Sequence, residues 1–161
     1  MDAVQLLIDQ HRRLEKRLEE AVEAKTPAER ARLLAGAGDD LAVHVASEEE
    51  VFYPAVKHRC TEDVLLESLE EHLSLKRLLA DLIALDADDR TYEAKLKVLA
   101  EQTEHHHKEE EEHLFPEVRK LVAADELARL GTEMRALQKQ MCREGDPREV
   151  MASETDKAAE L

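Results

Sequence analysis

The chain has few of the residues that interrupt helices. Its 161 residues include only four glycines and four prolines. Leucine, alanine, glutamate, lysine and arginine predominate, and this composition favours long helices over sheets. The sequence therefore predicts an all-α fold in one domain with a true core.

Cysteine is also scarce. Cys60 and Cys142 stand far apart in the sequence and form no Cys-x-x-Cys pair. The sequence therefore indicates neither a disulfide framework nor a thiolate metal site. No signal-peptide pattern opens the chain, and no run approaches the roughly 18 apolar residues of a membrane span. We expect a reducing, cytoplasmic setting.

Basic residues are in the minority. Aspartate and glutamate number 38 against 23 lysines and arginines, which gives a net charge of −15. A charge of this sign repels phosphate groups, so the sequence predicts no nucleic-acid partner, no membrane partner and no large anionic substrate. A small neutral ligand would be unaffected by it.

The chain does contain a repeat. The string HVASEEEVFYP at 44–54 returns as HHKEEEEHLFP at 106–116. In each copy a His precedes a Glu by four residues, a spacing that puts both side chains on one face of a helix. A further His stands 33 residues upstream of the first copy and 34 upstream of the second, at His11 and His72. A duplicated helix pair predicts an antiparallel up-down-up-down four-helix bundle over residues 1–122.

Local signals indicate where the helices begin. Asp2 is the expected N-cap of the first helix, and Thr26 with Pro27 is the expected start of the second. The third helix should start near Thr61, and residues 86–90 should form the turn before the fourth. Apolar residues at alternating spacings of three and four mark the core-facing side of each helix, and in all four a His stands among them.

The end of each repeat and the end of the chain carry their own signals. Pro54 and Pro116 should kink or end their helices. A further apolar stripe predicts a C-terminal helix over residues 123–143, docked on the bundle or on a partner. Residues 144–161 have few large apolar groups and are expected to form a flexible tail.

Six polar side chains occupy core-facing positions, and together they suggest a metal site: His11, His44, Glu48, His72, His106 and Glu110. Burying two carboxylates without compensation costs several kcal/mol each, and no Lys or Arg occupies a central core-facing position. Imidazole with carboxylate suits iron, manganese or zinc. Six ligands are too many for one tetrahedral zinc, and they suit two ions that share both glutamates, each ion with two histidines. An oxygen bridge would then leave an open position on each ion for dioxygen, peroxide or nitric oxide.

The order His, His-x-x-x-Glu, His, His-x-x-x-Glu resembles the hemerythrin-like (HHE cation-binding) family over residues 4–122. The resemblance implies a four-helix bundle with a non-haem di-iron centre that has an oxo or hydroxo bridge. It also implies that the six residues named above are the ligands, with both glutamates bridging.

Two positions depart from the oxygen-carrying members of this family. Lys76 stands where those proteins have a second His on the third helix, and His106-x-x-x-Glu110 replaces their His-x-x-x-x-Asp. The unequal five-histidine site of the oxygen carriers is therefore not reproduced. The bacterial and iron-sensing branch is the nearer match.

Other polar residues near the motifs have open roles. His113 is expected on the face of the second motif, either as a fifth histidine ligand or proton donor for bound peroxide, or as a residue one turn beyond the site. His105 and His107 fall about 100° to either side of that face and are expected at the surface or its boundary. Glu49 and Glu111 are available as acceptors for ligand imidazoles.

Two functions remain open from the sequence. The first is a di-iron protein that binds iron and a small ligand for oxygen binding, storage or sensing. The second is an oxidoreductase of the catalase or peroxidase type, which removes peroxide or nitric oxide under oxidative stress. No output domain is evident after the short C-terminal helix, so we expect a stand-alone protein, as a monomer or weak homodimer. A metal-free interaction module would leave two carboxylates buried without a counter-charge.

Overall fold

The computed structural model describes residues 1–59 and 62–161. All regular structure in these residues is helical, which confirms the predicted all-α class. The helices are α1 (Ala3–Glu23), α2 (Pro27–Ser47), η1 (Glu48–Phe52), α3 (Tyr53–Val56), α4 (Glu62–Ala84), α5 (Tyr92–Glu109), η2 (Glu110–Leu114), α6 (Phe115–Leu121), α7 (Ala124–Glu144) and α8 (Pro147–Ala152), where η1 and η2 are π-helical turns. Within the described ranges, no helix combines the length and apolarity that a bilayer crossing requires.

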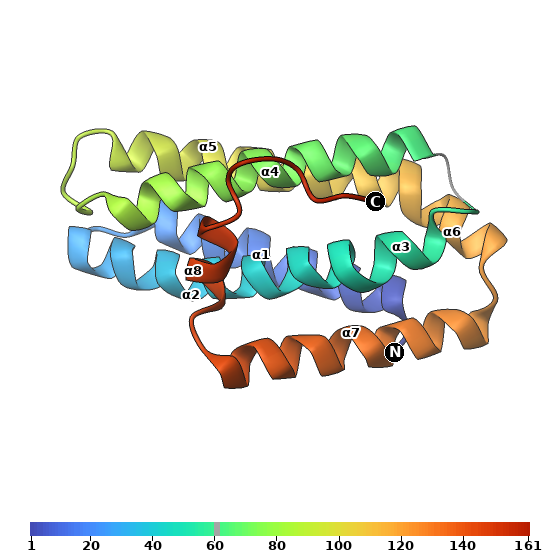
Figure 1. Ribbon diagram of the computed structural model, residues 1–161. Helices are drawn as coiled ribbons and strands as arrows, with labels where there is room; N and C mark the ends of the chain where they lie inside the picture. The colour runs from blue at the N-terminus through green and yellow to red at the C-terminus, as the bar shows by residue number, and fades with distance from the viewer. Residues whose placement is uncertain (60–61) are drawn as a thin grey trace.

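The long helices α1, α2, α4 and α5 lie side by side along one direction (Figure 1). Helix α1 packs against α2 and α5, and α4 packs against α5. η1 and α3 continue the line of α2, and η2 and α6 continue the line of α5. Helix α7 covers the outside of α1 and α2.

The predicted helix starts are confirmed where the structure describes them. The Asp2 carboxylate accepts a hydrogen bond from the Gln5 N–H at 2.8 Å, and the Thr26 hydroxyl accepts one from the Glu29 N–H at 3.2 Å. These bonds satisfy amide groups that have no partner inside the first turn of a helix. The start expected near Thr61 lies outside the described residues.

Pro54 and Pro116 do not end their helices, contrary to one of the two outcomes predicted for them. Each is the second residue of a helix, α3 or α6, that follows a π-helical turn. The N–H groups of Tyr53 and Phe115 reach back five residues to the carbonyls of Glu48 and Glu110. The wider turn accommodates one extra residue, so the chain continues as a helix past a proline that cannot donate.

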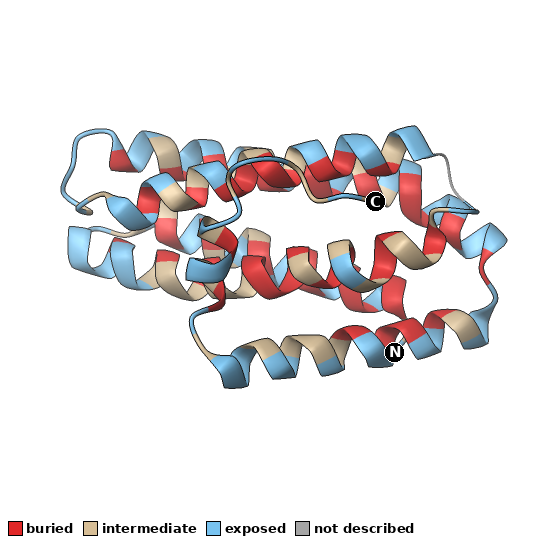
Figure 2. Ribbon diagram, in the orientation of Figure 1, coloured by how far each residue is buried: buried red, intermediate tan, exposed pale blue. Residues whose placement is uncertain are grey.

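The apolar core consists of two clusters with the polar centre between them. Along α1, His11 stands between Leu7 of the first cluster and Leu14 of the second. Along α4, His72 likewise stands between Leu69 and Leu75. The buried residues face inward along these helices (Figure 2). Because burying one leucine side chain contributes about 1.5–3 kcal/mol, two such clusters can hold a polar layer in place.

Residues 144–161 are folded back against the other helices, whereas the sequence predicted a flexible tail. Helix α8 buries Met151, which is 3% exposed, and packs on α2 and α4. Further on, the Arg77 guanidinium donates to the carbonyls of Thr155 and Asp156, and the final Leu161 packs against the first apolar cluster. The last residues cross over α4 (Figure 1). A few apolar side chains and two backbone carbonyls therefore fix this segment.

Candidate metal centre

The six polar residues singled out in the sequence converge in the middle of the molecule. Each is at most 1% exposed: His11, His44, Glu48, His72, His106 and Glu110. They come from α1, α2, η1, α4, α5 and η2. The His-x-x-x-Glu spacing places each imidazole against a carboxylate on its own helix, with Nε2 3.2 Å from Oε1 in both copies.

Contacts between helices complete the cluster. The His72 Nε2 atom lies 3.0 Å from Glu48 Oε2 and 3.0 Å from the Nε2 atom of His106. On the opposite side, His11 Nε2 lies 3.4 Å from Glu110 Oε1. The two glutamates therefore stand between imidazoles of four helices.

The possible ligand atoms of these six residues form two overlapping groups, within each of which they lie no more than 4.8 Å apart. One group contains His11, His44, Glu48 and Glu110, and the other contains Glu48, His72 and His106. Glu48 belongs to both groups. Glu110 Oε1 also lies 3.2 Å from His106 Nε2, so both carboxylates reach toward both groups.

Unpartnered atoms at the centre fit a bound cation. His11 Nε2, His44 Nε2, Glu48 Oε1 and Glu110 Oε1 are buried and have no hydrogen-bond partner within residues 1–59 and 62–161. A buried polar atom without a partner costs about 1–3 kcal/mol. Lone pairs on two imidazoles and two carboxylates are what a divalent transition metal binds. The donor set therefore fits one or two cations.

Oxygen atoms hold the outer nitrogen of each imidazole. As anticipated, Glu49 lies 2.8 Å from His72 Nδ1, and Glu111 lies 2.8 Å from His11 Nδ1. A proton on Nδ1 directed at such an oxygen leaves the Nε2 lone pair facing the centre.

Two further oxygen partners were not foreseen. Gln10 lies 2.9 Å from His44 Nδ1, and Glu71 lies 3.2 Å from His106 Nδ1. Gln10 and Glu71 each directly precede a histidine of the centre, so they are equivalent positions of the repeat. That equivalence was the available signal, and it indicates that the duplication includes the surroundings of the ligands.

Tyr53 is a residue of the buried cluster that the sequence reasoning missed. Its hydroxyl donates to Glu110 Oε2 at 2.9 Å and lies 3.4 Å from both Glu48 Oε2 and His72 Nε2. Burial, with the charges on both glutamates, raises the pKa of Tyr53 well above its ordinary value, so the phenol stays protonated. The second copy has Phe115 here, and this added hydroxyl was the only signal in the sequence.

Ion pairs between imidazoles and carboxylates set the charge of the centre. Burial raises the pKa of Glu48, but the charge on His44 and hydrogen bonds from His106 and His72 outweigh it and hold that pKa well below its usual value. Burial and the charge on Glu48 raise the pKa of Glu110, but His106 outweighs both and lowers it to about 2. Burial lowers the pKa of His106, but the charge and hydrogen bond of Glu110 raise it well above its ordinary value. Protons on these imidazoles therefore compete with a metal cation.

This competition predicts the pH dependence of stability. The lowered pKa of Glu110 stabilises the fold above its unfolded value of 4.5, and this contribution disappears as the pH falls toward about 2. The raised pKa of His106 stabilises the fold below 6.5, and this contribution disappears as the pH rises through the folded value. Melting curves of metal-free protein should show greatest stability between about pH 4.5 and 6.5 and a decline above it. Iron-loaded protein should gain more over the metal-free form as the pH rises, and a gain that shrinks instead would contradict the assignment.

His113 does not share the face of the second motif, so that expectation is wrong. Its side chain is 58% exposed and lies 3.7 Å from Glu109 and 3.9 Å from Glu112, both near it in sequence. His113 lies inside the π-helical turn η2, and the wider turn rotates it away from Glu110. It is placed neither to touch a ligand in the centre nor to bond across to another helix.

Of the two histidines that flank His106, only His105 is exposed. His105 is 65% exposed, as expected, but His107 is only 1% exposed because α5 packs this side against α1. Burial holds the pKa of His107 at about 3, so its ring is neutral. Lys76 is also buried, at 2% exposed, although the sequence indicated only that no Lys or Arg occupies a central core-facing position. It pairs with Glu49 at 2.8 Å, not with the two central glutamates.

The fold and the buried cluster define an all-helical protein with His and Glu groups that can hold metal. The hemerythrin HHE cation-binding domain family matches residues 2–118, and the chain belongs to this family. The solved structure of a hemerythrin HHE cation-binding domain-containing protein from Mycobacterium kansasii is similar in fold. Its TM-score is 0.78 at 22% identity, over 93% of this chain and 89% of that one.

A curated relative is a DNA nickase from Nostoc sp. It is 30% identical over 97 residues, which are 60% of this chain and 28% of the nickase. The chain thus spans less than a third of the length of the curated relative it matches.

Proposed function

We propose that the protein is a non-haem di-iron protein that binds iron and a small ligand such as dioxygen, nitric oxide or peroxide. In this proposal α1, α2, α4 and α5 form a four-helix bundle around the metal. The observation that carries it is the pair of overlapping ligand groups that share Glu48. One ion would be held by His11 and His44, the other by His72 and His106, with Glu48 and Glu110 between them.

Iron is proposed because of the donor set. Imidazole and carboxylate ligands without thiolate suit iron, manganese or zinc, and six ligands around two shared carboxylates exceed what one tetrahedral zinc takes. When bound, two iron ions supply reversible oxidation and a Lewis-acidic position for a small oxygen or nitrogen ligand.

The protein's own residues would hold and isolate the centre. The oxygens on the four Nδ1 atoms fix the direction of each imidazole. The two apolar clusters exclude water on either side. Tyr53 directs a hydroxyl between the carboxylates, where its single proton can turn from Glu110 to a small ligand.

The metal content tests this proposal. Protein purified from iron-supplemented cells should contain close to two irons per chain and show charge-transfer absorption of an oxygen bridge in the near ultraviolet. The absorption should shift when azide or nitric oxide is added, because a small ligand enters the iron coordination. Protein that purifies with zinc alone, or that binds no metal when reconstituted with iron, would contradict the proposal.

The hydroxyl of Tyr53 supports a second candidate, an enzyme that removes hydrogen peroxide. A general acid contributes about 100-fold or more to such a reaction, and Tyr53 is the neutral oxygen donor nearest both carboxylates. Under this candidate Tyr53→Phe should keep its iron and lose about 100-fold in peroxide turnover. His113→Ala should turn over peroxide like the parent because His113 is exposed. Equal turnover by parent and Tyr53→Phe would show that Tyr53 is not the acid, and no turnover by the iron-loaded parent would leave only the binding function.

DNA cleavage is not part of the proposal. The chain matches only 28% of the nickase. A net charge of −15 also opposes the approach of a polyanion.

A further inference from the structure

A fifth histidine, His107, lies beside the centre but in neither of the ligand groups used above. Its Nε2 atom is buried and has no hydrogen-bond partner in the described part of the chain. His11, His44 and His107 each have a nitrogen that lies within 4.8 Å of the others, so these three form an additional group able to bind metal. His107 is therefore placed to act as a further metal ligand beside His11 and His44.

The orientation of the rings shows how His107 can act. Its ring stacks on that of His11, with centroids 3.7 Å apart and planes 9° apart. An imidazole lone pair lies in the ring plane, so two parallel rings cannot both point at one ion. The ring of His44 is edge-on to both, at 74° to His107 and 70° to His11. An ion on His44 can therefore be shared with either His107 or His11, one after the other.

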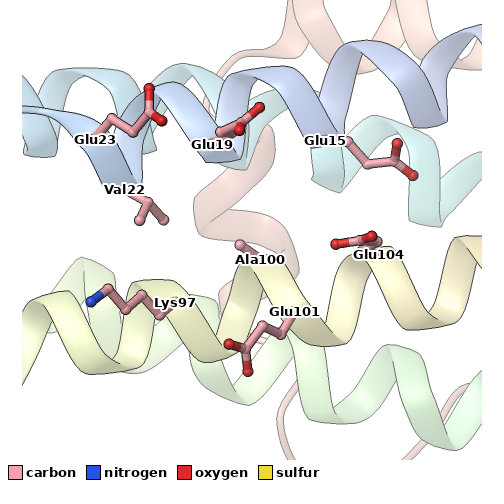
Figure 3. A pocket seen from close by; sticks show the side chains of 8 residues that line it. All are labelled: Glu15, Glu19, Val22, Glu23, Lys97, Ala100, Glu101 and Glu104. Atoms are coloured by element: carbon pink, nitrogen blue, oxygen red, sulfur yellow. The ribbon is translucent and has the colours of Figure 1, made fainter.

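An acidic groove on the surface is lined by Glu15, the residue that contacts His107. The groove lies between α1 and α5 and has a volume of about 480 Å³. Five glutamates and one lysine are its charged lining residues (Figure 3): Glu15, Glu19, Glu23, Glu101, Glu104 and Lys97. The Oε1 atom of Glu15 lies 3.1 Å from His107 Nδ1. Glu15, which also accepts hydrogen bonds from the Arg12 guanidinium, therefore lies between the groove and the Nδ1 side of the buried ring.

A comparable groove between α4 and α5 lacks this connection. It has a volume of about 440 Å³, and Glu67, Glu70 and Glu71 line it. Glu71 contacts His106 Nδ1, but His106 Nε2 already lies 3.0 Å from the Nε2 atom of His72. Among the residues that the structure describes, no buried histidine with a free nitrogen adjoins this second groove. It serves as an internal control.

We propose that His107 and His44 form a loading site for divalent cations, and that the groove lined by Glu15 is the route by which the cation arrives. This proposal rests on the di-metal function proposed above. The glutamates concentrate the cation at the groove by attraction, and Glu15 passes it to His107. The ion then exchanges His107 for His11 while it stays on His44, and it settles against Glu48 and Glu110.

Cobalt(II) uptake by the metal-free full chain, followed by its visible absorption in a stopped-flow instrument, tests the proposal. His107→Phe keeps an aromatic ring, slightly larger than imidazole, beside His11 and removes both nitrogens. We expect uptake to slow about tenfold or more, because the variant lacks one metal ligand in the transition state. A rise of about 1.4 kcal/mol in the activation free energy slows a reaction tenfold. Release of cobalt from the loaded protein to EDTA should slow by the same factor, because both directions share one route. The final content should stay at two ions per chain.

Paired groove variants separate the route from the fold. Glu19→Gln with Glu104→Gln should slow uptake and weaken its dependence on salt, because the groove attracts the cation less. Glu67→Gln with Glu70→Gln, in the other groove, should load like the parent. Three results would overturn the proposal: an uptake rate unchanged by His107→Phe, loss of one ion per chain at equilibrium in that variant, or equal slowing by both groove pairs. A parent chain that takes up no cobalt would instead refute the di-metal function itself.

Discussion

Glu48→Ala should lose both metal ions and much of the thermal stability together. Glu48 is the residue common to both ligand groups, so its removal takes a ligand from each ion. Metal binding stabilises the folded state by about 4 kcal/mol when free metal is 1,000 times the dissociation constant. For a chain of 161 residues this corresponds to a fall of about 8–16 °C in melting temperature.

Two controls isolate the metal contribution. Glu50→Ala changes an exposed glutamate in the same π-helical turn and should keep its iron and its melting temperature. Melting the parent and Glu48→Ala both with and without iron separates lost metal binding from lost ion pairs. If Glu48→Ala still holds two irons and melts like the parent, the ligand assignment is wrong.

Lys76→Ala should be strongly destabilising, although Lys76 is not a proposed metal ligand. Lys76 is 2% exposed and lies 2.8 Å from Glu49, whose other oxygen holds His72 Nδ1. Removing one member of a buried ion pair leaves the other charge uncompensated and costs about 3–5 kcal/mol. We expect the melting temperature to fall by about 6–20 °C, measured by circular dichroism.

A double variant tests whether the uncompensated charge is the cause. Lys76→Met with Glu49→Gln removes both charges, keeps both shapes, and leaves an amide oxygen to accept from His72. It should recover most of the stability lost by Lys76→Ala, since replacing a buried ion pair by neutral groups is often nearly neutral. A double variant as unstable as Lys76→Ala would show that the lost bond between Lys76 and Glu49, not an uncompensated charge, is responsible. Lys120→Ala, which changes a lysine 71% exposed, should melt like the parent.

The sequence predicted the positions of some residues of the site correctly and those of others incorrectly. His44 and Glu48 were identifiable because a spacing of four places side chains on one face of any α-helix, whatever surrounds it. His107 and His113 were misplaced because the prediction assumed a regular helix lying alone. A π-helical turn moved His113 outward, and the packing of α5 on α1 enclosed His107. Neither the π-helical turn nor the packing of α5 on α1 can be predicted from the spacing of residues alone.

Sequence alone determined the all-helical class, the helix starts at Asp2 and Thr26, and the set of imidazoles and carboxylates that meet in the core. These properties follow from local spacing and capping, which act over one or two helical turns. Tertiary structure alone decided the place of Tyr53 between the carboxylates, the burial of Lys76 and the docking of residues 144–161. The physical reason is that burial and contacts between helices depend on which helix faces pack together. The residue spacing within one helix does not specify the helix that packs against it.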